Sequence, residues 1–475
     1  YYLTRNVTLT NDATLKSANI CLNGYTVTLS GSATRIRAGV NGTDDCWGSL
    51  TDCTGKGTVT GGGVFIWYNG TFNLYGGTLR GTHVEISQTG GGTFNLYGGT
   101  ITGNETTVAP VDGQNSDKIT VNMYGGEISG NRNTSENEDE GGGGVYVGQG
   151  NQFNMYGGTI KNNSAKNGGG VRIAAAGTTY GSGTFTMSGG EISGNTASGK
   201  GGGVYVGGWI NDSGSAEIYD NTGNGGANNV YLPGGKAITL TGELLGTHPI
   251  GVTTAAAPAD GKPVTIVRGS NDYTIKAADQ DHFTSDVDNS YEMNLTGKAL
   301  ELAVKPHVHP VSTGANVTWK PLGSEAELRG VTAVTRDSCY YYLTSDIALT
   351  TETWKPASGM VLDLNGHSIT AQDAFDTITV GDGVSFTLVD CKGGGESTNY
   401  GFVTHFKDPN NNTKPRVSGR GVMVSDGGHF IMYGGCVGPN QTTDAGAGVY
   451  VAEGGHFAMY GGEIAGNVEP ATGGS

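Results

Sequence analysis

The sequence predicts an all-β fold, a right-handed parallel β-helix (solenoid) in which one complete module is followed by the start of a second. Three observations lead to this prediction: a short motif recurs along the chain, apolar residues alternate within it, and 86 of the 475 residues are glycine. A helical array of the tetratricopeptide type would repeat at a similar spacing, but no ten-residue stretch shows a 3.6-residue period. We therefore exclude a helical repeat.

The recurring motif is TFNLYGGT, which stands unchanged at 71–78 and 93–100 and returns in variants such as VNMYGGEISGN and FAMYGGEIAGN. Successive copies are separated by 22, 27, 32 and 32 residues, and the last pair by 27. Short strands repeated at this spacing cannot bury a core alone and are typical of a solenoid. The residues before the Gly pair are Tyr75, Tyr97, Tyr124, Tyr156, Ser188, Tyr433 and Tyr460.

Each copy of the motif predicts one inward and one outward face. Within FNLY the period is two, so Phe72 and Leu74 point inward while Asn73 and Tyr75 point outward. The Gly pair permits the positive φ of a sharp bend. Successive coils should therefore stack their inward residues in two ladders, Phe72, Phe94, Val121, Phe153, Phe185 and Leu74, Leu96, Met123, Met155, Met187.

Two further strands complete the predicted coil. The second follows the Gly pair and buries an isoleucine, and the third reads V-x-V or V-x-I, as at 64–66 and 204–206. Three strands separated by turns make a coil of about 22 residues, and parallel strands of neighbouring coils would lie about 4.8 Å apart. The predicted isoleucine ladder is Ile101, Ile128, Ile160 and Ile192.

Two copies of one opening indicate two modules. Tyr2 matches Tyr342, and SLTDC, which ends at Cys53, matches TLVDC, which ends at Cys391. The second copy stops before its last V-x-V strand, so we expect the native protein to continue beyond Ser475. The pairs Asn23-Gly24 and Asn365-Gly366 match as well.

We predict a first module at 1–305, a linker at 306–338 and a truncated second module at 339–475. The first module would close in a hairpin around Thr296 and Gly297. Its cap, regular coils and closing region should occupy about 1–59, 60–232 and 233–305.

Composition excludes several classes of protein. With 35% apolar and 15% charged residues the chain reads as neither membrane-embedded nor disordered, and no apolar run approaches a membrane span. A net charge of −16 argues against a nucleic-acid partner. The six cysteines include no C-x-x-C pair, which argues against a metal cluster. A bridge between Cys46 and Cys53 and a set of reduced, mostly buried thiols both remain open.

Several motifs together resemble a known family. The YYLT opening, LNGxxIT, LTDC, the FxMYGGxISGN and GGGVYV coils, and NVYLPxGKxITLTG are similar to tandem β-helix modules of large secreted or wall-anchored surface proteins of gut Firmicutes. The likeness covers nearly the whole chain. It implies an extracellular, adhesin-like protein, although such families include adhesins, binders of host proteins and some glycan-active enzymes. It supplies no catalytic motif.

The turns and outward strand positions supply a candidate binding face. Turn insertions on a solenoid collect on one side, often the binding side. The turns after the V-x-V strands carry aromatic rings, which offer contact area for sugars or proteins. The alternative is that these rings only shield neighbouring turns. The proposed contacts are the turn residues Trp67, Tyr68, Tyr180 and Trp209 and the outward strand residues Tyr146, Arg172 and Tyr205.

A catalytic pair is the second candidate. Glu85 points outward from its V-x-V strand, and Asp112 stands on the next coil, so the two carboxylates could lie about 5 Å apart, as in retaining glycosidases. Pro110 and Gly113 are expected to disturb this register. A solvated Glu and a turn Asp are the alternative.

No metal or other cofactor is predicted. His429 and His456 should stack on successive coils, but a third ligand is not evident. The acidic residues Glu136, Glu138, Asp139 and Glu140 could attract calcium, but they lack the D-x-D-x-D-G spacing of a dedicated loop. A solvated loop is the alternative interpretation.

The expected function is a bacterial binding or adhesion module, secreted or attached to the cell wall, that recognises a host glycan or host glycoprotein, with immunoglobulin as one conceivable case. Tandem copies would add avidity. The absence of a motif for phosphate, nucleotide or triad chemistry favours binding. The alternative is an enzyme acting on polysaccharides or mucin-type glycans, a hydrolase or lyase. Neither nucleic acid nor membrane insertion is expected.

Overall fold

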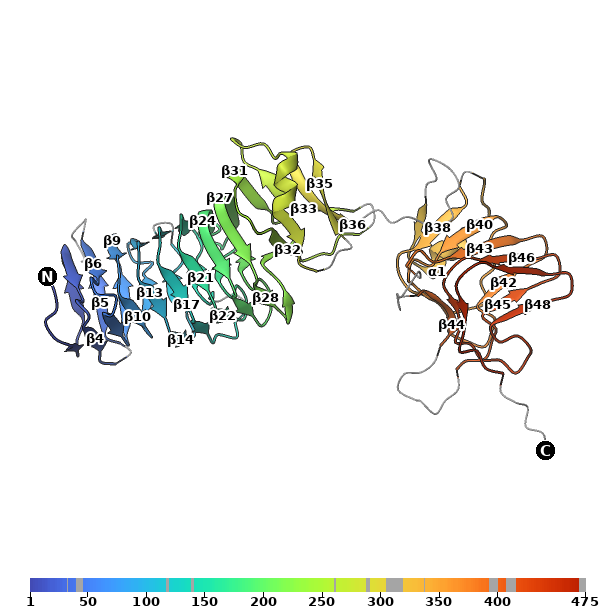
Figure 1. Ribbon diagram of the computed structural model, residues 1–475, viewed down its shortest axis with the longest axis horizontal. Coiled ribbons are helices and arrows are strands. Elements are labelled where there is room, and N and C mark those ends of the chain that lie inside the picture. The colour runs from blue at the N-terminus through green and yellow to red at the C-terminus, as the bar shows by residue number, and fades with distance from the viewer. Residues whose placement is uncertain are drawn as a thin grey trace, which may run out of the picture. The chain divides into compact units, whose positions relative to one another are not determined.

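The computed structural model divides the chain into two compact units, Tyr1–Lys305 (unit 1) and Pro306–Ser475 (unit 2), each with its own hydrophobic core (Figure 1). In the described part of the chain no helix is long and apolar enough to cross a bilayer. The structure describes residues 1–31, 33–39, 46–116, 119–137, 141–259, 262–287, 291–304, 319–336, 338–392, 400–406 and 416–469.

The described strands of unit 1 lie in three sheets, in which successive coils pair in parallel. Sheet A contains β1 (Val7–Leu9), β3 (Ala18–Cys21), β4 (Thr26–Leu29), β6 (Trp47–Thr51), β7 (Thr58–Thr60), β9 (Gly70–Leu74), β10 (Thr78–Arg80), β12 (Gly92–Leu96), β13 (Thr100–Thr102), β16 (Ile119–Met123), β17 (Glu127–Ser129), β20 (Gln152–Met155), β21 (Thr159–Lys161), β24 (Thr184–Ser193), β27 (Trp209–Tyr219), β31 (Ile238–Leu244), β33 (Val264–Gly269), β35 (Tyr291–Thr296) and β36 (Ala299–Val304). Sheet B contains β2 (Ala13–Leu15), β5 (Arg35–Ala38), β8 (Gly63–Ile66), β11 (His83–Ile86), β15 (Val111–Gly113), β19 (Val145–Val147), β23 (Val171–Ile173), β26 (Val204–Val206), β30 (Val230–Leu232), β32 (Ile250–Thr254) and β34 (Phe283–Ser285). Sheet C contains β14 (Glu105–Thr106), β18 (Arg132–Asn133), β22 (Ser164–Ala165), β25 (Thr196–Ala197), β28 (Thr222–Gly223) and β29 (Gly226–Ala227).

The inward ladders are as predicted. Phe72 lies in register with Phe94, and the same column continues through Val121, Phe153 and Phe185, all buried. The rings of Phe153 and Phe185 stack with centroids 4.8 Å apart. The isoleucine ladder is in register and buried as well. The chain is thus nearly all β, with long parallel sheets compatible with a solenoid.

Sheet C was not predicted. The segments between the second and third predicted strands of a coil, from Glu105 onward, each contain a two-residue strand that pairs with the same strand of the next coil. So short a strand shows no hydrophobic period in the sequence, because a period of two needs more than two residues. Many coils therefore have four strands.

A ladder of buried asparagines joins the coils beside sheet C. The backbone N–H and side-chain amide of Asn104 both donate to Oδ1 of Asn131, at 3.1 and 3.0 Å, and Asn131 makes the same pair of bonds to Asn163. Asn195, Asn221 and Asn229 continue the pattern. The carboxylate of Asp286 ends it by accepting both donors of Asn229.

Unit 1 closes as an antiparallel extension of sheet A. The predicted hairpin pairs β35 with β36 around Gly297, and β36 also pairs antiparallel with β33. A short 3₁₀ helix, η1 (Ala277–His282), packs beside β34 and β35.

Unit 2 repeats the parallel arrangement. Sheet D contains β37 (Lys320–Leu322), β38 (Tyr340–Leu343), β40 (Met360–Asp363), β43 (Ser385–Val389), β46 (His429–Met432) and β49 (His456–Met459). Sheet E contains β39 (Ile347–Leu349), β41 (Ile369–Ala371), β44 (Phe402–His405), β47 (Cys436–Val437) and β50 (Glu463–Ile464), and sheet F contains β42 (Ile378–Val380), β45 (Val422–Val424) and β48 (Val449–Val451).

The expected linker needs correction. Residues 305–318 lie outside the described residues, but β37 pairs in parallel with β38, and helix α1 (Glu325–Gly330) follows it. Leu322 and Leu328 are buried in the core of unit 2 because this segment covers the first strands. The described stretch from Trp319 onward is therefore part of the unit.

The matching openings have the same local structure. Asn23 adopts a φ of 50° and Asn365 one of 49°, and each side-chain amide donates to a carbonyl of an earlier coil. The glycine that follows donates its N–H to a carboxylate in the next coil, Asp52 at 2.7 Å in unit 1 and Asp390 at 2.9 Å in unit 2. The LNG and DC motifs thus join two neighbouring coils by hydrogen bonds.

The cysteine expectations also need correction. Cys53 does not bridge to Cys46; its Sγ lies 2.7 Å from Sγ of Cys21, on the preceding coil. Cys46, Cys339 and Cys436 are buried, whereas Cys53 is exposed, so the thiols do not form one uniform class. The strand register explains the pairing, because Cys21 lies opposite Thr51.

The asparagine ladder yields a stability prediction. Asn131→Ala removes the acceptor of Asn104 and two buried donor contacts, so unit 1 should lose about 2–5 kcal/mol of unfolding free energy. Asn122, half-buried in an outward row of the same coil, is the matched control; Asn122→Ala should cost less than about 1 kcal/mol. Urea unfolding followed by circular dichroism measures both values. Equal losses would contradict the role of the ladder.

Candidate binding groove

The outward positions of sheet B form one column across the coils. Register pairing places Glu85 beside Asp112, then Tyr146, Arg172 and Tyr205 on successive strands. The expected disturbance at Asp112 is absent, because β15 pairs regularly with both of its neighbours. The column begins with Thr14, Arg37 and Phe65 and ends with Tyr231 and Thr253.

Neighbouring side chains hold the Glu85 carboxylate in place. Its carboxylate accepts from Arg35 at 3.1 Å and from the Gln114 amide at 2.7 Å, and the His83 ring lies 3.9 Å away. The nearby His83 ring, followed by the charge of Arg35, lowers the pKa of Glu85 although burial opposes the shift. An ionised carboxylate held in this way is a poor proton donor, which weakens its case as a general acid.

Trp67 and Tyr68 belong to an aromatic cluster at this end of the column. The Trp67 indole N–H donates to the Gly39 carbonyl at 2.8 Å, and its ring lies 4.5 Å from that of Tyr68 and 5.7 Å from that of Phe65. The Arg37 guanidinium lies 5.1 Å from the ring centroid of Trp67. Trp67 is half-buried, so it contributes more to packing than to an open contact surface.

A groove of about 470 Å³ lies over the later coils. Arg172 on its floor is 5% exposed, and its guanidinium lies 4.9 Å from the ring centroid of Tyr205. At the rim, the Lys236 ammonium lies 4.5 Å from the ring of Trp209, which is 55% exposed. The described lining residues are Tyr146, Gln149, Arg172, Ala174, Ala175, Ala176, Tyr205, Gly207, Pro233 and Lys236.

The seven proposed contact residues therefore do not form one platform. Tyr146, Arg172 and Tyr205 line the groove, with Trp209 beside it, whereas Trp67 and Tyr68 follow β8, five strand steps before β26 in sheet B. At about 4.8 Å a step Trp67 lies roughly 14 Å along the sheet from Tyr146 and roughly 24 Å from Tyr205. Tyr180 is half-buried in the loop after β23 and is not among the described lining residues.

Lys236 and Pro233 also line the groove, although the sequence did not predict them as site residues. They lie in the turn between β30 and β31, in the stretch taken as the start of the closing region. Because β30 pairs with β26, this turn lies beside the groove. The pattern LPGGK marks a turn but gives no sign of which coil the lysine faces.

A row of exposed tyrosines on sheet A was also not considered as a site. The rings of Tyr75, Tyr97, Tyr124 and Tyr156 stack with centroids 4.7, 4.8 and 5.0 Å apart. Each inner ring covers the faces of its neighbours, and burial raises the pKa of Tyr97. The inner rings, Tyr97 and Tyr124, thus present mainly their edges and hydroxyls, so this row stabilises the turns more readily than it stacks against a sugar.

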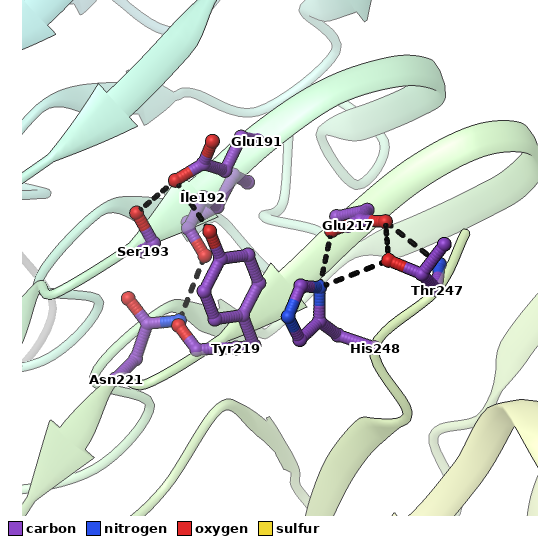
Figure 2. A network of polar contacts seen from close by, with 8 residues as sticks. All are labelled: Glu191, Ile192, Ser193, Glu217, Tyr219, Asn221, Thr247 and His248. Carbon is purple, nitrogen blue, oxygen red and sulfur yellow. Dashed lines mark hydrogen bonds and ion pairs between the residues drawn. The ribbon is translucent and has the colours of Figure 1, made fainter.

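A polar cluster on β24 and β27 holds two carboxylates on neighbouring strands (Figure 2). Glu217 accepts from the backbone N–H of Thr247 at 2.7 Å and contacts Nδ1 of His248 at 2.6 Å; Glu191 accepts from the hydroxyl of Tyr219 at 2.9 Å. The Tyr219 and His248 rings stack with centroids 4.0 Å apart. Burial raises the pKa of Glu217, but these hydrogen bonds bring it below its ordinary value. The cluster fastens the segment between β31 and β32 to sheet A.

His429 and His456 stack as expected, with centroids 4.6 Å apart. Among the residues that the structure describes, no group of three or more His, Cys, Asp or Glu side chains is arranged to hold a metal ion. Of the acidic residues that could attract calcium, Glu138, Asp139 and Glu140 lie outside the described residues. Comparison with family models, with curated proteins and with solved structures gives no match for the chain.

A buried carboxylic acid lies in the core of unit 1, on β27, the strand that follows β26 along the chain. Asp212 occupies an inward position of β27, between Met187 and Leu240 in the core ladder, and is fully buried. Oδ1 accepts from the N–H of Ser213, while Oδ2 has no hydrogen-bond partner among the described residues. Burial raises the pKa of Asp212 to about 7.

Asp212 predicts a pH-dependent stability. Because its folded pKa lies above the ordinary value of 3.8, unfolding free energy should fall as pH rises from about 4 and level off above about 7. At about 1.36 kcal/mol per pKa unit, the loss is roughly 4 kcal/mol. Asp212→Asn should abolish this pH-dependent component. The unfolding free energy of the variant should therefore increase relative to that of the wild type as pH rises. Asp220→Asn, an exposed change in the same coil, is the control. A variant difference that stays constant between pH 4 and 8, measured by urea unfolding, would contradict a raised pKa.

Proposed function

We propose that this chain is a bacterial binding or adhesion module, secreted or attached to the cell wall, that recognises a host glycan or host glycoprotein, immunoglobulin being one conceivable case. The groove carries the proposal. It places Tyr146, Arg172 and Tyr205 beside Lys236 and the exposed Trp209. Its volume falls in the range of small-ligand sites, and such sites combine apolar or aromatic walls with a few placed polar groups.

The fold inferred for both units is a right-handed parallel β-helix. The parallel strand register and the stacked core ladders support a helix of coils, and connections between parallel strands are right-handed in almost all proteins. Such a rod holds its outward columns at fixed spacing. A second unit with the same opening supports a tandem arrangement, in which weak contacts add to avidity.

A glycan-active enzyme is the second candidate function. The register pairing of Glu85 with Asp112 favours it, because neighbouring strands bring two carboxylates to the spacing of a retaining glycosidase. The contacts of Glu85 with Arg35 and Gln114 weigh against it, since they hold the carboxylate in its ionised form. Neither proposed function calls for a metal or other cofactor.

The whole chain should be screened against a glycan array and against immobilised host secretions, immunoglobulins included. For a ligand that binds, the Tyr205→Ala, Trp209→Ala double variant should lose at least tenfold in affinity, because it removes one ring of the groove floor and one of its rim. Tyr156→Ala, which removes a similarly exposed ring of sheet A, should bind like the wild type. Full affinity in the double variant would refute the groove as the site.

The same samples test the enzyme. Reducing sugars or unsaturated products released over hours would reveal hydrolysis or elimination, and Glu85→Gln should then abolish the release. Product formation that is unchanged in Glu85→Gln would reject that pair of carboxylates.

A further inference from the structure

Two cysteines of unit 1 meet across neighbouring coils. Cys21 is the last residue of β3, and Cys53 follows β6, the strand that pairs with β3 in parallel. Their Sγ atoms lie 2.7 Å apart. Two zinc–sulfur bonds of about 2.3 Å in a tetrahedral site would keep the sulfur atoms roughly 3.8 Å apart, so this pair is too close to share a metal ion. A disulfide needs only a further approach of roughly 0.7 Å.

Hydrogen bonds of the adjoining residues hold the two cysteines in this position. The N–H of Leu22 donates to the Thr51 carbonyl at 2.8 Å, and the Asp52 carboxylate accepts from the N–H of Gly24 at 2.7 Å. Parallel strands of neighbouring coils lie about 4.8 Å apart, and a disulfide spans Cα atoms that are roughly 4.4–6.8 Å apart. Because the coils are already fixed at a suitable spacing, the bond can form without a rearrangement of the backbone.

Unit 2 joins the same two positions by a different contact. Asp363 precedes the LNG motif as Cys21 does, and Cys391 ends the DC motif as Cys53 does. The Asp363 carboxylate accepts the backbone N–H of Cys391 at 3.0 Å. In unit 1 the corresponding N–H of Cys53 donates to the sulfur of Cys21, which is a weaker acceptor than a carboxylate. The coils of unit 1 therefore gain more from a covalent bond at this point.

The two thiols also have the reactivity that bond formation needs. A hydrogen bond from the Cys53 thiol lowers the pKa of Cys21. A lower pKa increases the fraction of thiolate, which is the nucleophile in thiol–disulfide exchange. Cys53 is exposed and Cys21 is partly exposed, so a small oxidant can reach the pair. Cys391 has the opposite properties, because burial raises its pKa and Asp363 stands where a second thiol would be needed.

We propose that Cys21 and Cys53 form a disulfide that joins two neighbouring coils of unit 1. The Cys21 thiolate attacks a sulfur atom of a small disulfide such as oxidised glutathione and expels one glutathione thiolate, which leaves a mixed disulfide. The Cys53 thiolate then attacks the Cys21 sulfur of this mixed disulfide and releases the second glutathione. The protein loses two protons and two electrons in all, and one oxidised glutathione becomes two reduced molecules.

The bond holds a strand that has few other partners. β3 pairs with β6, and on its other side the described chain offers only the isolated bridge between Tyr2 and Cys21. A strand paired along one edge opens more readily, and a covalent link to the next coil restricts the opened states. Because each coil of a solenoid contacts only its neighbours, the effect is confined to the first coils. The bridge is independent of the proposed function, although disulfides persist best in oxidising compartments such as the extracellular space.

Peptide mapping of the whole chain under non-reducing conditions, after incubation with oxidised glutathione, tests the bridge. We expect a cross-linked pair of peptides that contain Cys21 and Cys53. Reduction with dithiothreitol should then speed amide hydrogen exchange in β3 at least about fivefold, because the opened states are no longer restricted. Exchange in β16, several coils further along unit 1, should not change and serves as the internal control.

Two serine variants complete the test. Cys53→Ser should show the faster exchange in β3 with or without dithiothreitol, whereas Cys391→Ser, the same change at the corresponding position of unit 2, should respond like the wild type. Alkylation of both thiols in the oxidised sample, or a cross-link from Cys53 to Cys46, would show that the proposed bridge does not form. A bridge that leaves the exchange of β3 unchanged would overturn its role in holding this strand. Thermal unfolding of each variant confirms that it is folded.

Discussion

The buried asparagine ladder is the interaction on which the coil arrangement depends. A turn inside a narrow solenoid carries backbone N–H groups that water cannot reach, and each must find an acceptor. The Oδ1 atom of each asparagine supplies that acceptor to the coil before it, at 2.9–3.1 Å between Asn131, Asn163 and Asn195. Since the bonds form only at one coil height, the ladder fixes the distance between coils, and Asp286 ends it with a carboxylate.

Uniform coil spacing turns outward positions into columns, and the columns carry the groove. Tyr146, Arg172 and Tyr205 stand on three successive strands, so ring and guanidinium meet without any loop having to position them. Lys236, in the turn after β30, completes the groove from outside the column, and its ammonium group lies over the Trp209 ring. A rigid floor with one adaptable rim suits recognition of a small group on a larger ligand.

The sequence was informative wherever its period was long enough to read. Phe72 and Phe94 could be placed in one core ladder because FNLY repeats letter for letter, and the outward position of Arg172 followed from V-x-V. The two-residue strands of sheet C gave no period. Lys236 could not be assigned to the groove, and Trp67 could not be separated from Trp209, because motif spacing gives a position within a coil but not the distance across several coils.

The two units show which motifs serve structure and which can serve recognition. The Asn-Gly turn, and the aspartate that accepts from the N–H of its glycine, occur in both openings with the same hydrogen bonds. They therefore explain the repeated sequence without any ligand. Both units also place an arginine over a tyrosine ring, Arg172 over Tyr205 and Arg420 over Tyr450. Asp376 and Asp444 offset the charge of Arg420, so this contact stabilises the fold of unit 2. Recognition is left to features that the two openings do not share, such as the groove lined by Tyr205 and Lys236.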